Sequence, residues 1–244
     1  MKKQILLFTI VCVLAFSALA QTAEDKPTIV AENMYILPKR GMEDKFEAAV
    51  LAHNKKFHPE GPYKAGLRKV EYGEMAGWYV FIYGPTTYAS LDSRPVKENG
   101  HSDDWTKTID PLIETYGKTA LWDFNSELSF GMDMLKTSKY YEVWSIDLKR
   151  GNYYRFKAIA GKLKKAYEAD GKTAFLIYEN PIHTAVGADV AILWSFDSYE
   201  SWSKDMGIKA TYEKTNGAGS WQQMLDEWTD ILVDYNSEIR SFIR

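Results

Sequence analysis

The sequence has only one cysteine, Cys12, among its 244 residues. This cysteine lies in an apolar run, residues 5–16, which follows two lysines and precedes the small residues of segment 17–20. The layout is that of a secretory signal peptide, and the run is too short to span a bilayer. We therefore expect residues 1–20 to form a signal peptide, cleaved near Ala20, and the protein to be exported to the periplasm or secreted. The mature chain would then lack disulfides, thiolate metal ligands and a cysteine nucleophile.

An excess of charge of one sign is also missing. Thirty basic and 33 acidic residues give a formal net charge of −3, so we expect no nucleic-acid partner. After the first apolar run the sequence has no hydrophobic stretch long enough to span a bilayer, so we expect no membrane insertion of the mature chain. Aromatic residues are abundant instead, at 14% of the chain, within a hydrophobic content of 45% that is typical of folded proteins.

The chain contains an internal repeat. Residues 39–48 recur as residues 149–158, and residues 123–128 recur as residues 234–239. Both pairs have nearly the same spacing, 110 and 111 residues. Conserved order at one spacing indicates a duplication. We therefore predict two units after the signal peptide, residues 21–137 and residues 138–244.

Each unit shows the same succession of periodic segments. Runs rich in β-branched and aromatic residues predict strands, and apolar residues at helical spacing predict helices. The predicted strands are residues 30–37, 66–73, 78–83, 140–148, 173–179 and 190–196, with a last strand in each unit opening at Asp123 or Asp234. The predicted second helical regions are residues 86–116 and 198–232, interrupted near Gly100 and near residues 217–219. The order βαββαβ predicts an α+β fold with two tandem ferredoxin-like units that form an intramolecular dimeric α+β barrel.

The second unit carries a short motif after its third predicted strand. Residues 194–202 read Trp-Ser-Phe-Asp-Ser-Tyr-Glu-Ser-Trp. This motif and the tandem layout resemble the dimeric α+β barrel superfamily, in particular the antibiotic-biosynthesis monooxygenases. The haem-degrading members use a first-strand Asn and a histidine of the second helix, so the resemblance implies Asn33 and His101 as catalytic residues and haem as a possible cofactor. These members also use a Trp in the second helix, and that position holds Leu91 in the first unit here. At the histidine position, the second unit carries Tyr212.

The four histidines do not have the spacing of a metal site. None forms an i, i+4 helical pair or a cluster with cysteine. His53 falls on the apolar face of a predicted helix and is expected in the core, whereas His58 and His183 are expected in a loop and a turn. From the residues alone we therefore predict no metal site and no cofactor.

Repeated polar residues and a few rings are the candidates for ligand binding. Asn125 and Glu127 recur as Asn236 and Glu238, and alternation along a strand would place each pair on one face. Such groups could contact a ligand, or they could cap helices and close turns. Most rings are expected in the core, because two units of this size need large side chains to bury enough apolar area. The predicted ligand-binding residues are Tyr35, Asn125, Glu127, Trp202, Tyr212, Trp221, Asn236 and Glu238.

Three functions remain compatible with the sequence. The first is binding of a small apolar or aromatic molecule in a pocket between sheet and helices. The second is an enzyme of the monooxygenase or isomerase type, cofactor-free or haem-dependent, that uses Asn33 and His101. The third is a structural or interaction module without catalysis. We expect a monomer, as an internal pseudo-dimer, or a homodimer.

Overall fold

The structure, a computed structural model, describes residues 27–95, 98–183, 187–204 and 207–244. The predicted signal peptide and Cys12 lie outside the described residues. In the part of the chain that the structure describes, no helix combines the length and the apolar character that a bilayer crossing needs.

The two halves of the chain contain the same order of major elements. The first half has β1 (Ile29–Pro38), α2 (Glu43–Phe57), β2 (Ala65–Tyr72), β3 (Tyr79–Thr87), α3 (Tyr88–Asp92), α4 (His101–Thr108) and β4 (Ile113–Phe124). The second half has β5 (Tyr140–Leu148), α5 (Tyr153–Asp170), β6 (Phe175–Glu179), β7 (Val190–Phe196), α6 (Tyr199–Trp202), α7 (Ile208–Asn216), α8 (Ser220–Ile231) and β8 (Leu232–Ile243). Short 3-10 turns occupy Gly61–Tyr63, Glu98–Gly100, Asp110–Leu112 and Met132–Lys136.

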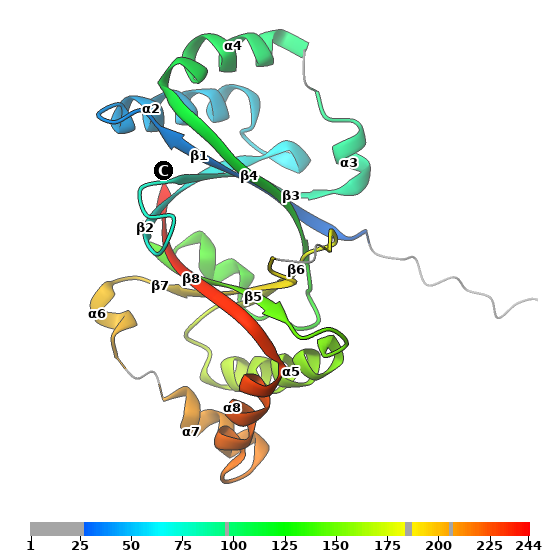
Figure 1. The fold of residues 1–244 in the computed structure, drawn as a ribbon. Helices are drawn as coiled ribbons and strands as arrows, with labels where there is room; N and C mark the ends of the chain where they lie inside the picture. Colours follow the sequence, from blue (N-terminus) through cyan, green and yellow to red (C-terminus); the bar gives the residue numbers. More distant parts are fainter. Residues whose placement is uncertain (1–26, 96–97, 184–186, 205–206) are drawn as a thin grey trace, which may run out of the picture.

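The strands form one closed antiparallel barrel. Their order around it is β1-β3-β2-β8-β5-β7-β6-β4. Within each half the order is the same, β4-β1-β3-β2 and β8-β5-β7-β6, and the halves meet where β2 pairs with β8 and where β4 pairs with β6. Figure 1 shows α2, α3 and α4 on one outer side of the barrel and α5, α7 and α8 on the opposite side. The barrel lumen therefore lies on the sheet faces that point away from the helices.

Side-chain alternation separates the lumen from the helix layers. On β5, Tyr141 and Val143 belong to a buried cluster with Ala191, whereas Ile146 and Leu148 pack with the residues of α5. Successive strand side chains point to opposite faces, so one strand supplies both layers. The lumen and the helix layers are therefore lined by different side chains, and a site could form in either.

The major helices begin as the repeat predicts. A turn at Gly41, with φ of 77°, precedes α2, and a turn at Gly151, with φ of 82°, precedes α5. These left-handed angles favour glycine. The predicted core faces are buried, with Phe46 and Val50 on α2 and Phe156 on α5 fully inaccessible.

The structure differs from the prediction at the last strand of the first half. The strand begins at Ile113, inside the region predicted to be helical, and it ends at Phe124. Asp110 and Pro111 end the helical region in a 3-10 turn, because proline offers no N–H to continue an α-helix. The repeated segment consequently begins at the last two residues of β4 and continues into the turn in the first half, whereas it lies entirely within β8 in the second.

Candidate functional site

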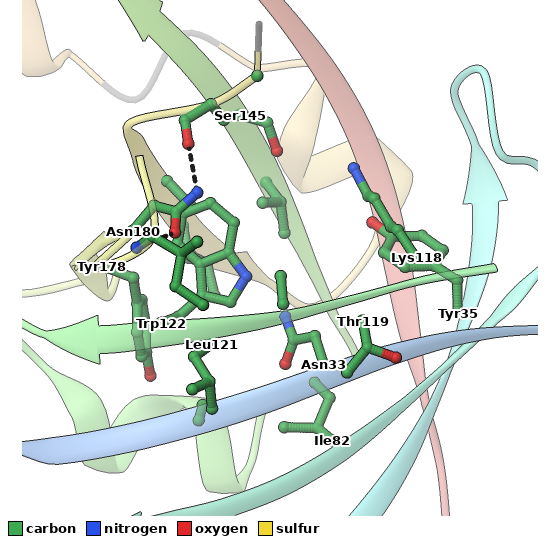
Figure 2. Close-up of a pocket in the computed structure, with 18 of the residues that line it drawn as sticks. Asn33, Tyr35, Ile82, Lys118, Thr119, Leu121, Trp122, Ser145, Tyr178 and Asn180 are labelled. Carbon is green, nitrogen blue, oxygen red and sulfur yellow. Dashed lines mark hydrogen bonds between the residues drawn. The ribbon is translucent and has the colours of Figure 1, made fainter. Parts of the chain in front are cut away.

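The barrel lumen contains a pocket of about 390 Å³. Its lining residues come from β1, β3, β4, β5, β6, β7 and β8 and from the loop after β6, and Figure 2 shows them converging from several strands. The sequence led us to expect a pocket between sheet and helices, and this expectation is wrong for this pocket, which lies on the inner face of the sheet. The volume is within the range of small-molecule sites.

Most of the pocket wall is apolar. It is formed by Ala31, Ile82, Leu121, Trp122, Val143, Ala191 and Leu193. The Trp122 ring is the largest apolar surface among them, and Figure 2 places it beside Leu121 and Tyr178. This wall suits an aliphatic or aromatic ligand body.

The polar end of the pocket is built around Tyr35 and Arg240. The Tyr35 hydroxyl donates to Glu238 Oε1 at 2.7 Å and accepts from Arg240 Nη2 at 2.7 Å. Arg240 also pairs directly with the Glu238 carboxylate, and all three side chains are buried. Burial, offset in part by Arg240, raises the pKa of Tyr35 well above its ordinary value, so its hydroxyl is protonated.

Positive charge exceeds negative charge at this end. Arg68 on β2 is buried against the Phe242 ring, with 4.2 Å between the guanidinium carbon and the ring centre. Lys118 on β4 lines the pocket, with its ammonium 5.2 Å from the centre of the Tyr35 ring. Glu238, the partner of Arg240, supplies one negative charge against the three positive charges of Arg68, Lys118 and Arg240. The lumen therefore favours an anionic group on a ligand.

Asn33 adds an unsatisfied polar atom to the wall. Its side chain lines the pocket from β1, as Figure 2 shows. Its buried Oδ1 has no hydrogen-bond partner among the described residues. An unpaired buried acceptor is costly, so a ligand donor at this position would be stabilising.

A group of three histidines lies in the helix layer of the first half. His53 of α2, His58 just after α2 and His101 at the start of α4 are close together. His53 Nε2 is 3.3 Å from His101 Nε2, which is 2.9 Å from His58 Nε2. Burial lowers the pKa of His58 to about 4 and also lowers the pKa of His53, so both imidazoles are neutral at neutral pH. The three residues therefore lie close together although their spacing in the sequence does not indicate a cluster.

The predicted catalytic pair is not brought together. Asn33 points into the lumen, whereas His101 contacts His53 and His58 in the helix layer on the other face of the sheet. The residues also do not fit a haem bound through His101, since its Nε2 faces two other imidazoles at 2.9 and 3.3 Å. An iron porphyrin could not reach that nitrogen without displacing them.

The repeated polar residues lie in different environments. Asn125 closes the turn after β4, where its Oδ1 accepts from the Leu128 N–H at 2.9 Å. Glu127 is exposed in the same turn, and Asn236 is exposed on β8. Of the four, only Glu238 reaches the lumen, because the repeated segment lies within a strand in the second half alone.

The other predicted ligand residues are in the helix layer of the second half, apart from Tyr35, which lines the lumen pocket. Tyr212 is buried against Trp221, with 5.4 Å between ring centres, and both pack on the core around α5. Trp202 is 47% exposed and donates from its indole nitrogen to Glu142 Oε2 at 2.9 Å. The structure does not bring these three rings to the lumen pocket.

Sequence reasoning missed Lys118, Trp122 and Arg240. Lys118 and Trp122 lie on β4, in segment 117–122, for which no element was predicted from the sequence. Arg240 lies two residues after Glu238, so the two side chains are on the same face of the strand. This period-2 pattern could have identified Arg240. The histidine cluster gave no sequence signal, because His101 lies 43 residues along the chain from His58.

Sequence comparisons give no match, either to a family model or to a curated protein. Solved structures match over most of the chain. A monooxygenase-like protein from Lactobacillus acidophilus NCFM has a TM-score of 0.56 at 8% identity and covers 89% of this chain and 95% of its own. A monooxygenase-like protein from Fusobacterium nucleatum has a TM-score of 0.56 at 13% identity, covering 88% and 93%. A chlorite dismutase mutant from Candidatus Nitrospira defluvii has a TM-score of 0.53 at 9% identity, covering 89% and 92%. These neighbours have the dimeric α+β barrel type of fold, and at such identities the likeness shows the fold alone.

Proposed function

We propose that this chain is an exported binding protein whose barrel lumen holds a small molecule with an apolar or aromatic body and an anionic group. The single observation that carries the proposal is the lumen pocket, which joins an apolar wall containing Trp122 to a cationic end containing Lys118 and Arg240. Export rests on the signal-like residues 1–20.

Each part of such a ligand has a partner in the pocket. The apolar body would lie against Trp122 and the neighbouring aliphatic side chains, where its burial is favourable. The anionic group would lie near Lys118, whose ammonium lies against the Tyr35 ring. This ammonium could donate a charge-assisted hydrogen bond to the ligand. A donor on the ligand would satisfy Asn33 Oδ1.

We further propose that the barrel consists of two tandem ferredoxin-like units, residues 21–137 and 138–244. The support is the sequence repeat together with the identical strand order of the two halves. A single chain would then supply both sheets of the barrel. This arrangement leaves the lumen enclosed without a second copy, in keeping with a monomer.

A second candidate is an enzyme that acts on the same kind of molecule. It is favoured by the structural neighbours, which include monooxygenase-like proteins and an anthrone oxidase-like protein. The site would be the lumen rather than the predicted pair of Asn33 and His101. The two functions differ in one outcome, because a binding protein returns its ligand unchanged whereas an enzyme converts it.

Fluorescence of 1-anilinonaphthalene-8-sulfonate tests the proposal, because this probe combines aromatic rings with a sulfonate. We expect saturable binding to the mature chain. Ala31→Phe fills the pocket wall and is expected to weaken binding more than tenfold, a loss of about 1.4 kcal/mol or more.

Ala31→Ser is the matched control, since it leaves the pocket open and should bind the probe as the unsubstituted chain does. Cooperative urea unfolding of each variant verifies folding, because partly folded chains also bind this probe. A folded Ala31→Phe variant with unchanged affinity would show that the probe does not bind in the lumen. Mass spectrometry of the recovered probe after aerobic incubation distinguishes binding from conversion.

A further inference from the structure

The three imidazoles of the first half present the same ring nitrogen to one another. His53 Nε2 and His58 Nε2 lie 3.3 and 2.9 Å from His101 Nε2, and the ligating atoms of the cluster all lie within 4.8 Å. Three nitrogen ligands at about 2.0–2.1 Å from a tetrahedral zinc ion are about 3.3 Å apart. The two separations from His101 Nε2 are close to this value.

The opposite ring nitrogens of two histidines are fixed by hydrogen bonds. His53 Nδ1 donates to Asp104 Oδ2 at 2.8 Å, and His58 Nδ1 donates to the Tyr63 carbonyl at 2.8 Å. A neutral imidazole that carries its hydrogen on Nδ1 has a lone pair on Nε2. Both lone pairs are therefore directed at the centre of the cluster, and the outer partners are of the kind that orient metal-ligating histidines.

Hydrogen bonding among the three rings alone does not satisfy this arrangement. His101 Nε2 carries at most one hydrogen, which it can donate to one of its two neighbours. The Nε2 lone pair of the other neighbour would then have no hydrogen to accept from His101. This lone pair lies in a site where His53 and His58 are buried. A cation at the centre would accept all three lone pairs.

The surroundings hold the rings in place. The His53 ring lies 4.8 Å from Phe57 and 5.2 Å from Trp105, and His58 lies 5.7 Å from Tyr83, measured between ring centres. These rings come from α2, α4 and β3, so the arrangement is built from rigid elements. His101 is only half-buried and forms the solvent side of the cluster.

The second half provides an apolar counterpart. The positions that correspond to His53 and His101 in the repeat are Leu163 and Tyr212, and both are buried in the core around α5. An ordinary hydrophobic contact is therefore sufficient for packing at this place in the fold. Histidines at these two positions in the first half, where the second half has Leu and Tyr, point to a role other than packing.

We propose that His53, His58 and His101 bind a divalent transition-metal ion of the zinc class through their Nε2 atoms, with Asp104 and the Tyr63 carbonyl orienting two of the ligands. Three protein ligands leave one coordination position for water or another small ligand on the His101 side. The site is on the outer face of the sheet, so it is separate from the lumen pocket and does not depend on the proposed binding function.

The test uses the mature chain, free of any histidine tag and treated with chelator, titrated with Co²⁺ and then with Zn²⁺. We expect one ion per chain, an intense visible absorption from tetrahedral Co²⁺, displacement of that absorption by Zn²⁺, and a higher midpoint of thermal unfolding with Zn²⁺. A chain that binds neither ion would overturn the proposal.

Three variants locate the ion. Asp104→Asn should lower Zn²⁺ affinity about 10–100-fold, the effect typical of outer partners, and His101→Ala should lower it further. His183→Ala is the matched control, because this histidine has a side chain 75% exposed in the other half, and it should leave binding unchanged. Unchanged binding in folded His101→Ala, or loss in His183→Ala, would contradict the assignment.

Imidazole ¹⁵N chemical shifts of the unsubstituted chain give a readout that does not depend on the folding of a variant. Zn²⁺ should shift the Nε2 resonances of His53, His58 and His101 and leave those of His183 unchanged. A shift of the His183 resonances alone, or no shift for any of the three cluster histidines, would overturn the proposal.

Discussion

Tyr35 and Glu238 are 203 residues apart in the sequence and are joined by a 2.7 Å hydrogen bond inside the barrel. Their strands, β1 and β8, are not neighbours in the sheet, so the bond crosses the lumen. Arg240 completes the group by donating to both side chains. This contact links the two halves of the chain and forms the polar end of the pocket.

Removal of Glu238 should destabilise the protein strongly. Glu238→Ala would leave Arg240 buried without its carboxylate, a change that typically costs about 3–5 kcal/mol. Tyr35→Phe removes one hydroxyl and should cost about 1–3 kcal/mol. Urea unfolding measures both, with Tyr154→Phe as the control, because Tyr154 is 68% exposed. A Glu238→Ala variant as stable as the control would show that the buried group contributes little.

Lys118 should determine the preference of the pocket for anions. Lys118→Gln is expected to weaken binding of 1-anilinonaphthalene-8-sulfonate several-fold, because the variant removes a charged partner of the sulfonate. The uncharged N-phenyl-1-naphthylamine should be affected little. Lys107→Gln is the control, since Lys107 has a side chain 73% exposed on α4 and pairs with Asp103. Equal losses for both probes would argue against a charge contact.

A carboxylate cluster near the end of β5 should make stability depend on pH. Burial and the charges of Asp189 and Asp234 raise the pKa of Asp147, and His183 lies 3.6 Å from Asp189. A carboxyl whose pKa is higher in the folded state costs stability as pH rises above its unfolded value near 4. Asp147→Asn should therefore raise the midpoint of thermal unfolding at pH 7 and have little effect at pH 3.

Asp197→Asn serves as the control for this prediction, because Asp197 is exposed. It should change the unfolding midpoint little at either pH. An Asp147→Asn effect of the same size at pH 3 and pH 7 would show that ionisation of Asp147 is not its cause.

Two glycines should respond to alanine in opposite directions. A Cβ on Gly117 would lie 2.7 Å from the Trp78 ring and 3.0 Å from Tyr35 Cβ, so Gly117→Ala should destabilise the protein and weaken probe binding. A Cβ on Gly161, inside α5, would meet only one atom, at 3.9 Å. Gly161→Ala should stabilise by up to about 1 kcal/mol, from helix propensity. Thermal unfolding of both variants tests the pair.

Much of the architecture could be predicted from the repeat and from periodicity. The predicted strand over residues 190–196 coincides with β7, and that over residues 140–148 coincides with β5. Local alternation and β-branched content are sufficient to identify these two strands. The predicted start of β4 was wrong, because segment 113–122 has several exposed polar residues and its strand character comes from pairing with β1.

The sites could not be predicted to the same extent. Asn33 and Tyr35 were identified and do line one pocket, but the lumen is formed by strands from both halves, and no local pattern shows which faces meet. The histidine cluster depends on where α4 packs against α2, a tertiary contact that sequence spacing does not encode. His53 was predicted in the core, and it is buried there beside His58, with the half-buried His101 next to them.

A crystal structure of the mature chain with bound 1-anilinonaphthalene-8-sulfonate tests the central claim most directly. We predict the probe in the barrel lumen, its rings against Trp122 and its sulfonate within hydrogen-bonding distance of Lys118. A probe bound in a helix layer or on the outer surface, with the lumen filled by its own side chains, would contradict the account.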